Sequence, residues 1–375
     1  MAPESSTDGD GWVAAGRPAA TAVALVVLAI TAVPRARAHE EYVVDGERET
    51  GVIEFLIEAL TDPFVVGPLL AGGALALGAV VGYLLVQPVQ RDIAAFRHAM
   101  GEYNGFVPWL LRISFGIPFI GAGFSGYFIS PAVDVELRLL QVALGFFLLF
   151  GLATRVVALV ALATYLVGVA VRPELLLQLE YAGGLAAIAL IGSGRPSGDH
   201  VLQRVAGSPG TVYRRFDPVH DVSRRFQEWV ADYERFLPTV VRAGLGVSFI
   251  YLGLTQKLLR PGLALAVVDR YDLTTALPVA PELWVLGAGL AEMALGLALL
   301  AGFFTRATAA TAIAMFSLTL FALPDDPVLA HVGLFGMAST LLITGAGPYA
   351  LDGRLERVTT DEERLSEAAA EIGSD

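Results

Sequence analysis

Three ionisable side chains lie inside apolar stretches in the second half of the chain, where they could carry out proton chemistry. Lys257 is the only lysine among 25 basic residues, so arginine serves at every other basic position. Lysine can lose its proton when it is buried and arginine cannot, which indicates that this position requires a titratable cation. Glu292 and His331 lie in two further apolar stretches. Because an ionisable group inside a membrane is costly, such residues usually mark a functional site.

The positions of these residues in their stretches predict a shared pocket. Lys257 lies about three residues below the predicted outer surface of the membrane and Glu292 about nine, a depth difference of roughly 9 Å at the helical rise. The two side chains meet only if Lys257 folds inward, and His331 lies at about the depth of Lys257. We therefore predict a polar pocket that opens outward, without a metal, and is lined by Gln256, Lys257, Glu292 and His331.

A purely structural interpretation stays open for each of these residues. Lys257 could extend to the outer lipid headgroups, as long basic side chains often do. Glu292 could be a protonated or hydrogen-bonded anchor between helices. His331 could be a buried structural histidine rather than a ligand.

The stretches that carry these residues are long enough to cross a membrane. Of the 375 residues, 55% are apolar and 17% are charged, and several apolar runs reach the length of about 20 residues that a spanning helix needs. We predict an all-α, polytopic helical membrane protein. Its helices are expected at about 64–86, 108–129, 137–153, 156–171, 176–192, 239–259, 283–303, 307–323 and 328–344.

The sequence contains an internal duplication. Residues 88–131 align with 218–261 at a constant offset of 130, with identities such as Arg112/Arg242. Later blocks align at an offset of 151, so the second copy has about 21 extra residues between them. This pattern predicts two tandem parallel four-helix bundles, each preceded by an amphipathic interfacial helix.

The copies differ at the ionisable positions. Tyr127 and Gln141 of the first copy stand where the second copy has Lys257 and Glu292. The second repeat is therefore predicted to be the active half, because it alone is charged there. We keep Tyr127, Gln141 and Glu180 as secondary candidates in the first repeat.

The distribution of arginine predicts the orientation of the chain. Arginines concentrate in the segment 193–237, which the positive-inside rule places in the cytoplasm together with the C-terminus. Arg112, Arg242, Arg155 and Arg306 are expected to fix topology and cap helices at the cytoplasmic ends. We predict a signal peptide or N-terminal anchor (1–38), an extracellular segment (39–63), an extra transmembrane helix (64–87), the first repeat (88–200), a cytoplasmic linker (201–217), the second repeat (218–353) and an acidic cytoplasmic tail (354–375).

The composition excludes several kinds of redox chemistry within this chain. It contains no cysteine and only five histidines, so disulfides, thiolate catalysis, iron–sulfur clusters and a bis-histidine haem in the membrane are excluded. A net charge of −12 with 24 arginines and one lysine fits a salt-rich cytosol. Nothing in the sequence indicates nucleic-acid binding.

The repeats resemble the DoxX/DoxD-like family of four-helix membrane proteins over roughly residues 108–200 and 238–353. The family pattern begins Arg…Gly…Phe…Gly-x-x-Lys, continues through Glu-x-x-x-Gly and Gly-x-x-Thr-Arg, and closes with Gly-x-Gly…Asp. The second repeat matches it at Arg242, Gly246, Phe249, Gly253, Lys257, Glu292, Gly296, Gly302, Thr305, Arg306, Gly345, Gly347 and Asp352. The first repeat keeps the glycines and the Thr154-Arg155 turn and has the family's Leu-Glu-Tyr at 179–181, but departs at Tyr127 and Gln141.

The resemblance implies a membrane subunit of a redox complex that passes electrons from a sulfur compound to quinone, in a prokaryotic cell membrane. The chain holds no cofactor motif, so a soluble partner protein would carry the redox centre, and quinone is the possible ligand of the pocket. Membrane lipid is a further partner, and oligomers are possible. A small-solute transporter and a non-catalytic scaffold or assembly factor are the alternatives.

Overall fold

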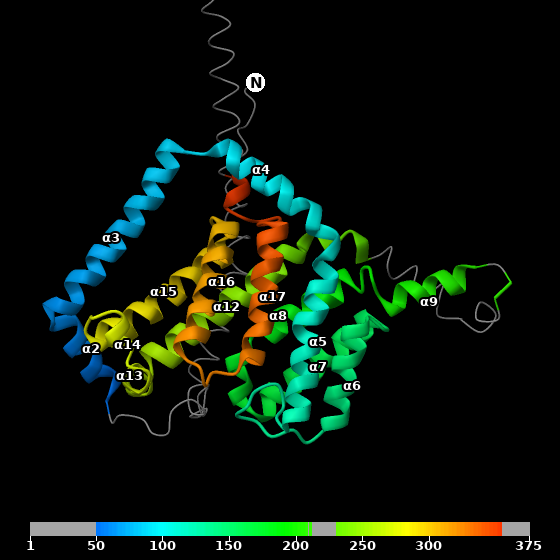
Figure 1. Cartoon of the computed structure of the whole chain (residues 1–375), viewed down its shortest axis with the longest axis horizontal. Coiled ribbons are helices and arrows are strands. Elements are labelled where there is room, and N and C mark those ends of the chain that lie inside the picture. The colour runs from blue at the N-terminus through cyan, green and yellow to red at the C-terminus, as the bar shows by residue number, and fades with distance from the viewer. Residues whose placement is uncertain (1–49, 209, 212–229, 355–375) are drawn as a thin grey trace, which may run out of the picture. The chain divides into compact units, whose positions relative to one another are not determined.

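The computed structural model describes residues 50–208, 210–211 and 230–354 of the chain. Three predicted segments lie wholly or mostly outside the described residues: the signal peptide at 1–38, most of the interfacial helix that precedes the second repeat, and the acidic tail after Arg354. Within the described part the chain is helical, with one isolated β-bridge between Tyr127 and Asp134 and no strand (Figure 1). The prediction of an all-α fold is therefore confirmed.

The protein is a multi-pass membrane protein. Among the described residues, six helical stretches are long and apolar enough to cross a membrane, and the other three predicted spans form shorter apolar helices of 13, 12 and 17 residues. The first four-helix unit comprises α5 (Val107–Ser125), α6 (Arg138–Phe150), α7 (Thr154–Val171) and α8 (Glu180–Ile191). The second comprises α12 (Leu237–Leu252), α15 (Pro281–Ala301), α16 (Thr305–Ala322) and α17 (Val328–Thr344).

Several helices lie outside the two units. Two of them lie where the sequence analysis predicts helices, namely α3 (Pro63–Val86), which is long and apolar enough to cross a membrane, and α4 (Gln90–Gly101). The short helices α2 (Val52–Thr61) and α9 (Gly198–Gly207) were not predicted. The 21 extra residues of the second repeat also fold, as α13 (Pro261–Arg270) and α14 (Leu273–Ala276).

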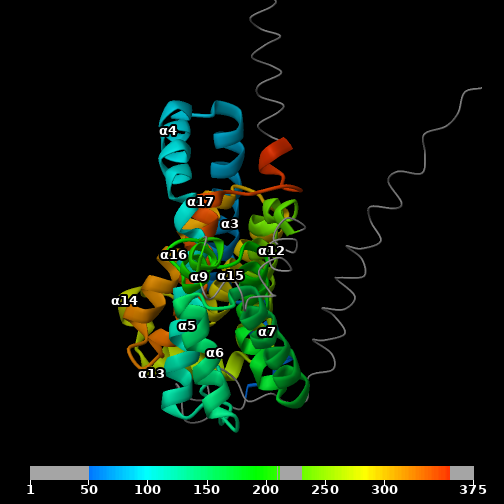
Figure 2. The same cartoon turned by 90° about the vertical axis from the view of Figure 1, so that its right-hand side faces the viewer.

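The two four-helix units share one core rather than forming separate bundles. In each unit the first helix packs most extensively on the second, so that α5 lies beside α6 (Figures 1 and 2) and α12 lies beside α15. Across the units, α5 packs on α17 and α12 packs on α8, and both contacts are larger than those of α5 with α8 or α12 with α17. One hydrophobic cluster accordingly contains Phe119 and Tyr165 from the first unit and Phe249 and Met337 from the second.

Small residues allow the two units to approach closely. A Cβ added to Gly183 on α8 would lie 2.5 Å from the Cα of Gly244 on α12. A Cβ added to Gly336 on α17 would lie 2.0 Å from the hydroxyl of Ser114 on α5. The second contact joins the positions that correspond to the first in the internal alignment, at offsets of 153 and 130. Glycine at helix crossings permits the close backbone contact that packing in a membrane requires.

The glycine-rich turns of each repeat are held by an aspartate. In the first unit Asp199 accepts hydrogen bonds from the backbone N–H of Ala153 and Thr154 at 2.6 and 2.9 Å. In the second, Asp352 accepts from Phe304 and Thr305 at the same two distances. Each aspartate thereby satisfies N–H groups at a helix N-terminus that would otherwise lack a partner.

The four arginines that recur in the two repeats divide into two pairs. Arg155 and Arg306 donate to carbonyl groups in the last turns of α8 and α17, so the expectation that they cap helices is confirmed. Arg242 likewise caps a helix, because it donates to the backbone oxygen of Leu299 in the last turn of α15 at 3.5 Å. The side chains of Arg112 and Arg242 are 1% and 2% exposed. Their guanidinium groups donate to the backbone oxygens of Pro196 and Pro348, 84 and 106 residues along the chain. These two arginines therefore tie each repeat's closing segment to its first helix.

Candidate functional site

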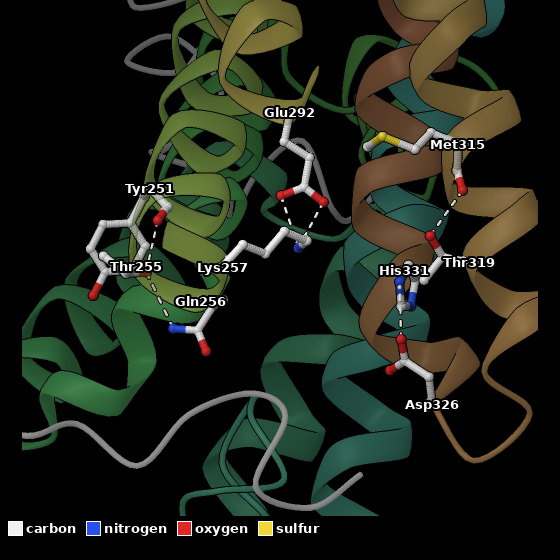
Figure 3. Close-up of polar contacts among 9 residues, drawn as sticks. All are labelled: Tyr251, Thr255, Gln256, Lys257, Glu292, Met315, Thr319, Asp326 and His331. Atoms are coloured by element: carbon white, nitrogen blue, oxygen red, sulfur yellow. Dashed lines mark hydrogen bonds and ion pairs between the residues drawn. The ribbon is translucent and has the colours of Figure 1, made fainter. Parts of the chain in front are cut away.

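The site is centred on an ion pair between Lys257 and Glu292. The Nζ atom of Lys257 lies 2.9 Å from one carboxylate oxygen of Glu292 and 3.0 Å from the other (Figure 3). The side chains are 21% and 15% exposed, so the pair is mostly buried. Lys257 thus folds inward, as the direct pair required, and does not simply extend to the headgroups.

Two glycines bring the charged residues together. Gly253 and Gly289 lie where α15 crosses the chain that continues from α12, and a Cβ on Gly253 would lie 2.7 Å from the backbone oxygen of Gly289. The same Cβ would lie 3.1 Å from the Cβ of Glu292. Side chains at these positions would push the helices apart, so the glycines set the distance that the ion pair spans.

The lysine sits on a π-helical segment, η5 (Gly253–Leu258), which follows α12 without a break. We expected one continuous α-helix over 239–259. A π-helical turn contains an extra residue and therefore turns the following side chains relative to the α-helix. Such turns are frequent at functional sites, and this one lies at the only lysine of the chain.

A second acid–base pair lies across from the first. His331, near the start of α17, places its Nε2 atom 3.5 Å from the carboxylate of Asp326 in the loop between α16 and α17 (Figure 3). The exposed fractions of the two side chains are 9% and 6%. The Nδ1 atom of His331 lies 3.4 Å from the backbone oxygen of Pro327, so both ring nitrogens face polar partners. The ionic partner of His331 is Asp326, a residue outside the predicted pocket.

Asp326 is the member of the site that the sequence analysis missed. Burial raises the pKa of its carboxyl group, while the charges of His331 and Lys257 lower it. One carboxylate oxygen of Asp326 has no hydrogen-bond partner within the described residues. In the sequence, the adjacent acids Asp325 and Asp326 resemble an ordinary polar loop. An acid five residues before a histidine in a predicted membrane helix was nevertheless a usable signal.

Gln256 does not join the charged residues. Its side chain is 5% exposed and points away from Lys257, where its Nε2 atom donates to the hydroxyl of Thr255 at 3.2 Å (Figure 3). The predicted four-residue pocket is thus replaced by Lys257, Glu292, Asp326 and His331, which we call the charged site.

The first repeat contains a neutral counterpart of the charged site. The amide of Gln141 donates to the backbone oxygen of Tyr127 at 3.2 Å and to that of Phe119 at 3.1 Å. Tyr127 and Gln141 thus lie together as Lys257 and Glu292 do, but without charge. Gln178 occupies the position of His331, at the offset of 153 that also aligns Gly192 with Gly345. Glu180 lies elsewhere, in the interface between the repeats.

The extra residues of the second repeat cover the predicted outer end of this unit. α13 packs on α15 and on η5, and its residues form a small hydrophobic cluster with α2 and α15. At the end of α13, Arg270 lies 2.9 Å from Asp325, and the hydroxyl of Tyr271 donates to the same carboxylate at 3.0 Å. The hydrogen bonds from Arg270 and Tyr271 lower the pKa of Asp325. The segment is therefore fastened to the loop that carries Asp326.

We expect the substitution Asp326→Asn to change how stability depends on pH. Because burial raises the pKa of Asp326, the unfolded chain releases this proton at a lower pH than the folded protein. Raising the pH from about 4 to about 7 therefore removes stability from the wild type through this group. As the pH rises over this range, the melting temperature of the Asn variant should increase relative to that of the wild type. A difference between the two that does not change with pH would contradict the prediction.

The fold and the charged site define a helical multi-pass membrane protein with buried acid–base groups in its second repeat. The DoxX family model matches residues 237–325, from the first residue of α12 to the loop after α16. This part of the chain is thus similar to the DoxX family, and the matched segment contains both Lys257 and Glu292. No curated protein and no solved structure matches the chain.

Proposed function

We propose that the protein is the membrane subunit of a redox complex and that its charged site binds a quinone and exchanges protons with it. The observation that carries this proposal is the ion pair between Lys257 and Glu292, at 2.9 Å, inside membrane helices and opposite a second acid–base pair. Two such pairs are more than anchoring requires, since a buried ion pair contributes little net stability.

The polar groups of the charged site suit the two states of a quinone. The ammonium group of Lys257 can donate a hydrogen bond to a quinone carbonyl oxygen. The free carboxylate oxygen of Asp326 can accept one from a quinol hydroxyl group. Asp326 and His331 can pass protons between the ligand and the predicted outer surface, because a carboxyl group and an imidazole can each accept and donate a proton.

The electrons would come from a soluble partner protein, and the sulfur compound would be oxidised there. The predicted orientation, with the C-terminus in the cytoplasm of a prokaryotic cell, places the charged site near the outer surface. This arrangement supports release or uptake of protons on that side. The hypothesis also explains why the first repeat, which has Tyr127 and Gln141 at the corresponding positions, keeps the fold without the charges.

The test is binding of a short-chain quinone to the purified protein in lipid nanodiscs. The wild type should bind with measurable affinity, and Glu292→Gln should weaken binding by at least about tenfold, which corresponds to about 1.4 kcal/mol. Gln141→Leu, at the corresponding position of the first repeat, is the matched control and should leave binding within a factor of about two. Absence of quinone binding by the wild type, in a preparation that retains its partner proteins, would end the proposal.

A small-solute transporter is the second candidate, and one observation favours it. The π-helical segment η5 interrupts the α-helix at the charged residue, as helices that line transport sites often do. Counterflow of a solute in vesicles that contain the purified protein would support this reading. If Lys257→Arg and Glu292→Gln leave both quinone binding and transport unchanged, the protein is a scaffold or assembly factor instead.

A further inference from the structure

We propose that Glu180 is a second proton-transfer site, an uncharged carboxyl group buried between the two repeats and linked by water to Gln178. This proposal does not depend on the charged site or on quinone binding. It assigns to the first repeat a chemical capacity of its own, although that repeat is neutral at the positions of Lys257 and Glu292.

The position of Glu180 is built by both repeats. It is the first residue of α8 and is 2% exposed. Its Cγ atom lies 3.8 Å from the point where a Cβ would stand on Gly333 of α17. Gly333 is the residue that corresponds to Glu180 in the second repeat, at the offset of 153. The second repeat therefore lacks a side chain at the place where the first repeat inserts a carboxyl group.

The groups that face Glu180 are mainly tyrosines. Tyr165 of α7 and the neighbouring Tyr181 lie close enough to Glu180 to interact with it electrostatically, and their rings stack with their centroids 6.2 Å apart. Tyr251 of α12 acts on Tyr165, and Tyr127 acts on Tyr181. Among the described residues, Arg260 is a cation close enough to interact with this cluster, through Tyr251.

Such surroundings favour the neutral form of the carboxyl group. A carboxylate among rings and phenol groups keeps most of the cost of leaving water, because phenol groups at neutral pH carry no charge. The protonated acid avoids this cost and offers one donor and further acceptors for hydrogen bonds. Glu180 therefore holds a proton in the resting protein, with no ionic partner required.

Unpartnered polar atoms of Glu180 and of Gln178, two residues before it in the chain, indicate how that proton can leave. One carboxyl oxygen of Glu180 and both polar atoms of the Gln178 amide are buried and have no hydrogen-bond partner within the described residues. Gln178 is also only 2% exposed. Buried polar groups are nearly always paired, and water is their usual partner when no protein group serves. Water bound by these three atoms gives Glu180 a partner for proton exchange.

The exchange itself is a simple acid–base step. The O–H bond of Glu180 breaks as a new O–H bond forms on a neighbouring water molecule, which carries the proton away. The carboxylate then takes a proton from water and returns to the resting state. No oxidant or reductant takes part, so the site can serve any process that moves charge within the neighbouring repeat.

Infrared spectroscopy of the purified protein in lipid tests this proposal. The wild type at neutral pH should show the C=O band of a protonated carboxyl group, and transfer to D2O should shift that band. Glu180→Gln should remove the band, and Glu180→Asp should move it. Gln178→Leu should leave the band in place but slow its shift in D2O by at least about tenfold, because exchange requires bound water. Glu136→Gln, which removes an exposed acid from an outer loop, is the matched control and should change nothing.

Two results would overturn the proposal. If the spectrum of the Glu180→Gln variant keeps every carboxyl band of the wild type, Glu180 is ionised and carries no proton. If the Glu180 band is present but does not shift in D2O, the acid is a sealed structural group. The wild-type measurement in D2O decides the second point even if a variant fails to fold.

Discussion

Removing either charge of the Lys257–Glu292 pair should destabilise the folded protein by about 3 kcal/mol, whereas removing both should cost much less. In Lys257→Met the carboxylate of Glu292 stays mostly buried without the ammonium group that lies 2.9 Å away. In Glu292→Met the ammonium group of Lys257 loses both carboxylate contacts. The penalty arises because a desolvated charge without its partner costs more than the pair contributes.

The double variant Lys257→Met/Glu292→Met separates stability from function. Both methionines resemble the replaced side chains in length and carry no charge, so the double variant should lie within about 1 kcal/mol of the wild type. It should nevertheless fail to bind quinone. Equilibrium unfolding of all four proteins in mixed micelles gives the coupling energy directly. If the destabilisation of the double variant equals the sum of those of the two single variants, the two charges do not interact.

The pair of Arg270 and Asp325 is the matched control for this experiment. Its atoms are also 2.9 Å apart, but its side chains are 43% and 54% exposed. Water already screens these charges, so removing one should change stability very little. A difference in destabilisation between the two pairs then measures the effect of burial, because the distance between the charged atoms is the same in both.

The helices and the central ion pair were predictable from the sequence for identifiable reasons. Apolar runs of membrane length place helices almost without regard to tertiary context, because backbone polar groups must be satisfied within the lipid. The pair of Lys257 and Glu292 was predictable because the cost of an ionised group in a membrane makes a partner necessary. That Lys257 turns inward depends on Gly253 and Gly289, whose effect is visible only once the helix crossing is known.

Other features depend on contacts that local sequence patterns do not encode. Asp326 lies in a polar loop, and only the return of the chain into α17 places it against His331. α13 is too short to be recognised by its apolar periodicity and gains its stability from packing on α15. The packing of each repeat's helices on the other repeat leaves no trace in either repeat alone. A sequence alignment of the two copies shows that they are similar, but it does not show which helices of one repeat pack on helices of the other.

The shared core gives the protein an unequal pair of repeats around one interface. Duplicated positions that face each other need not stay alike, so one can lose its side chain while the other keeps a large polar one. Glu180 and Gly333 are such a pair, and Tyr127 and Lys257 show the same divergence at a site away from the interface. We interpret the duplication as the reason why corresponding positions can diverge: one copy maintains the packing while the other acquires charge.

Substitution of one glycine tests the shared core with a large expected effect. Gly183→Ala should destabilise the protein by about 2–3 kcal/mol, because the new Cβ would stand 2.5 Å from the backbone of Gly244 and helices α8 and α12 would have to separate. Gly72→Ala, on α3, is the matched control. A Cβ there meets nothing within 4 Å, so the change should be neutral or stabilise by up to about 1 kcal/mol through helix propensity.

The corresponding contact in the other half makes the test specific for packing between the repeats. Gly336→Ala should also destabilise the protein, because its Cβ would overlap the side chain of Ser114. Here a second substitution, Ser114→Gly, removes the obstructing atoms and should restore most of the lost stability. No such rescue exists for Gly183→Ala, since its partner is already glycine. Thermal unfolding of the wild type and the four variants in the same lipid tests this prediction. If Gly183→Ala behaves like Gly72→Ala, helices α8 and α12 are not in contact and the repeats form separate bundles.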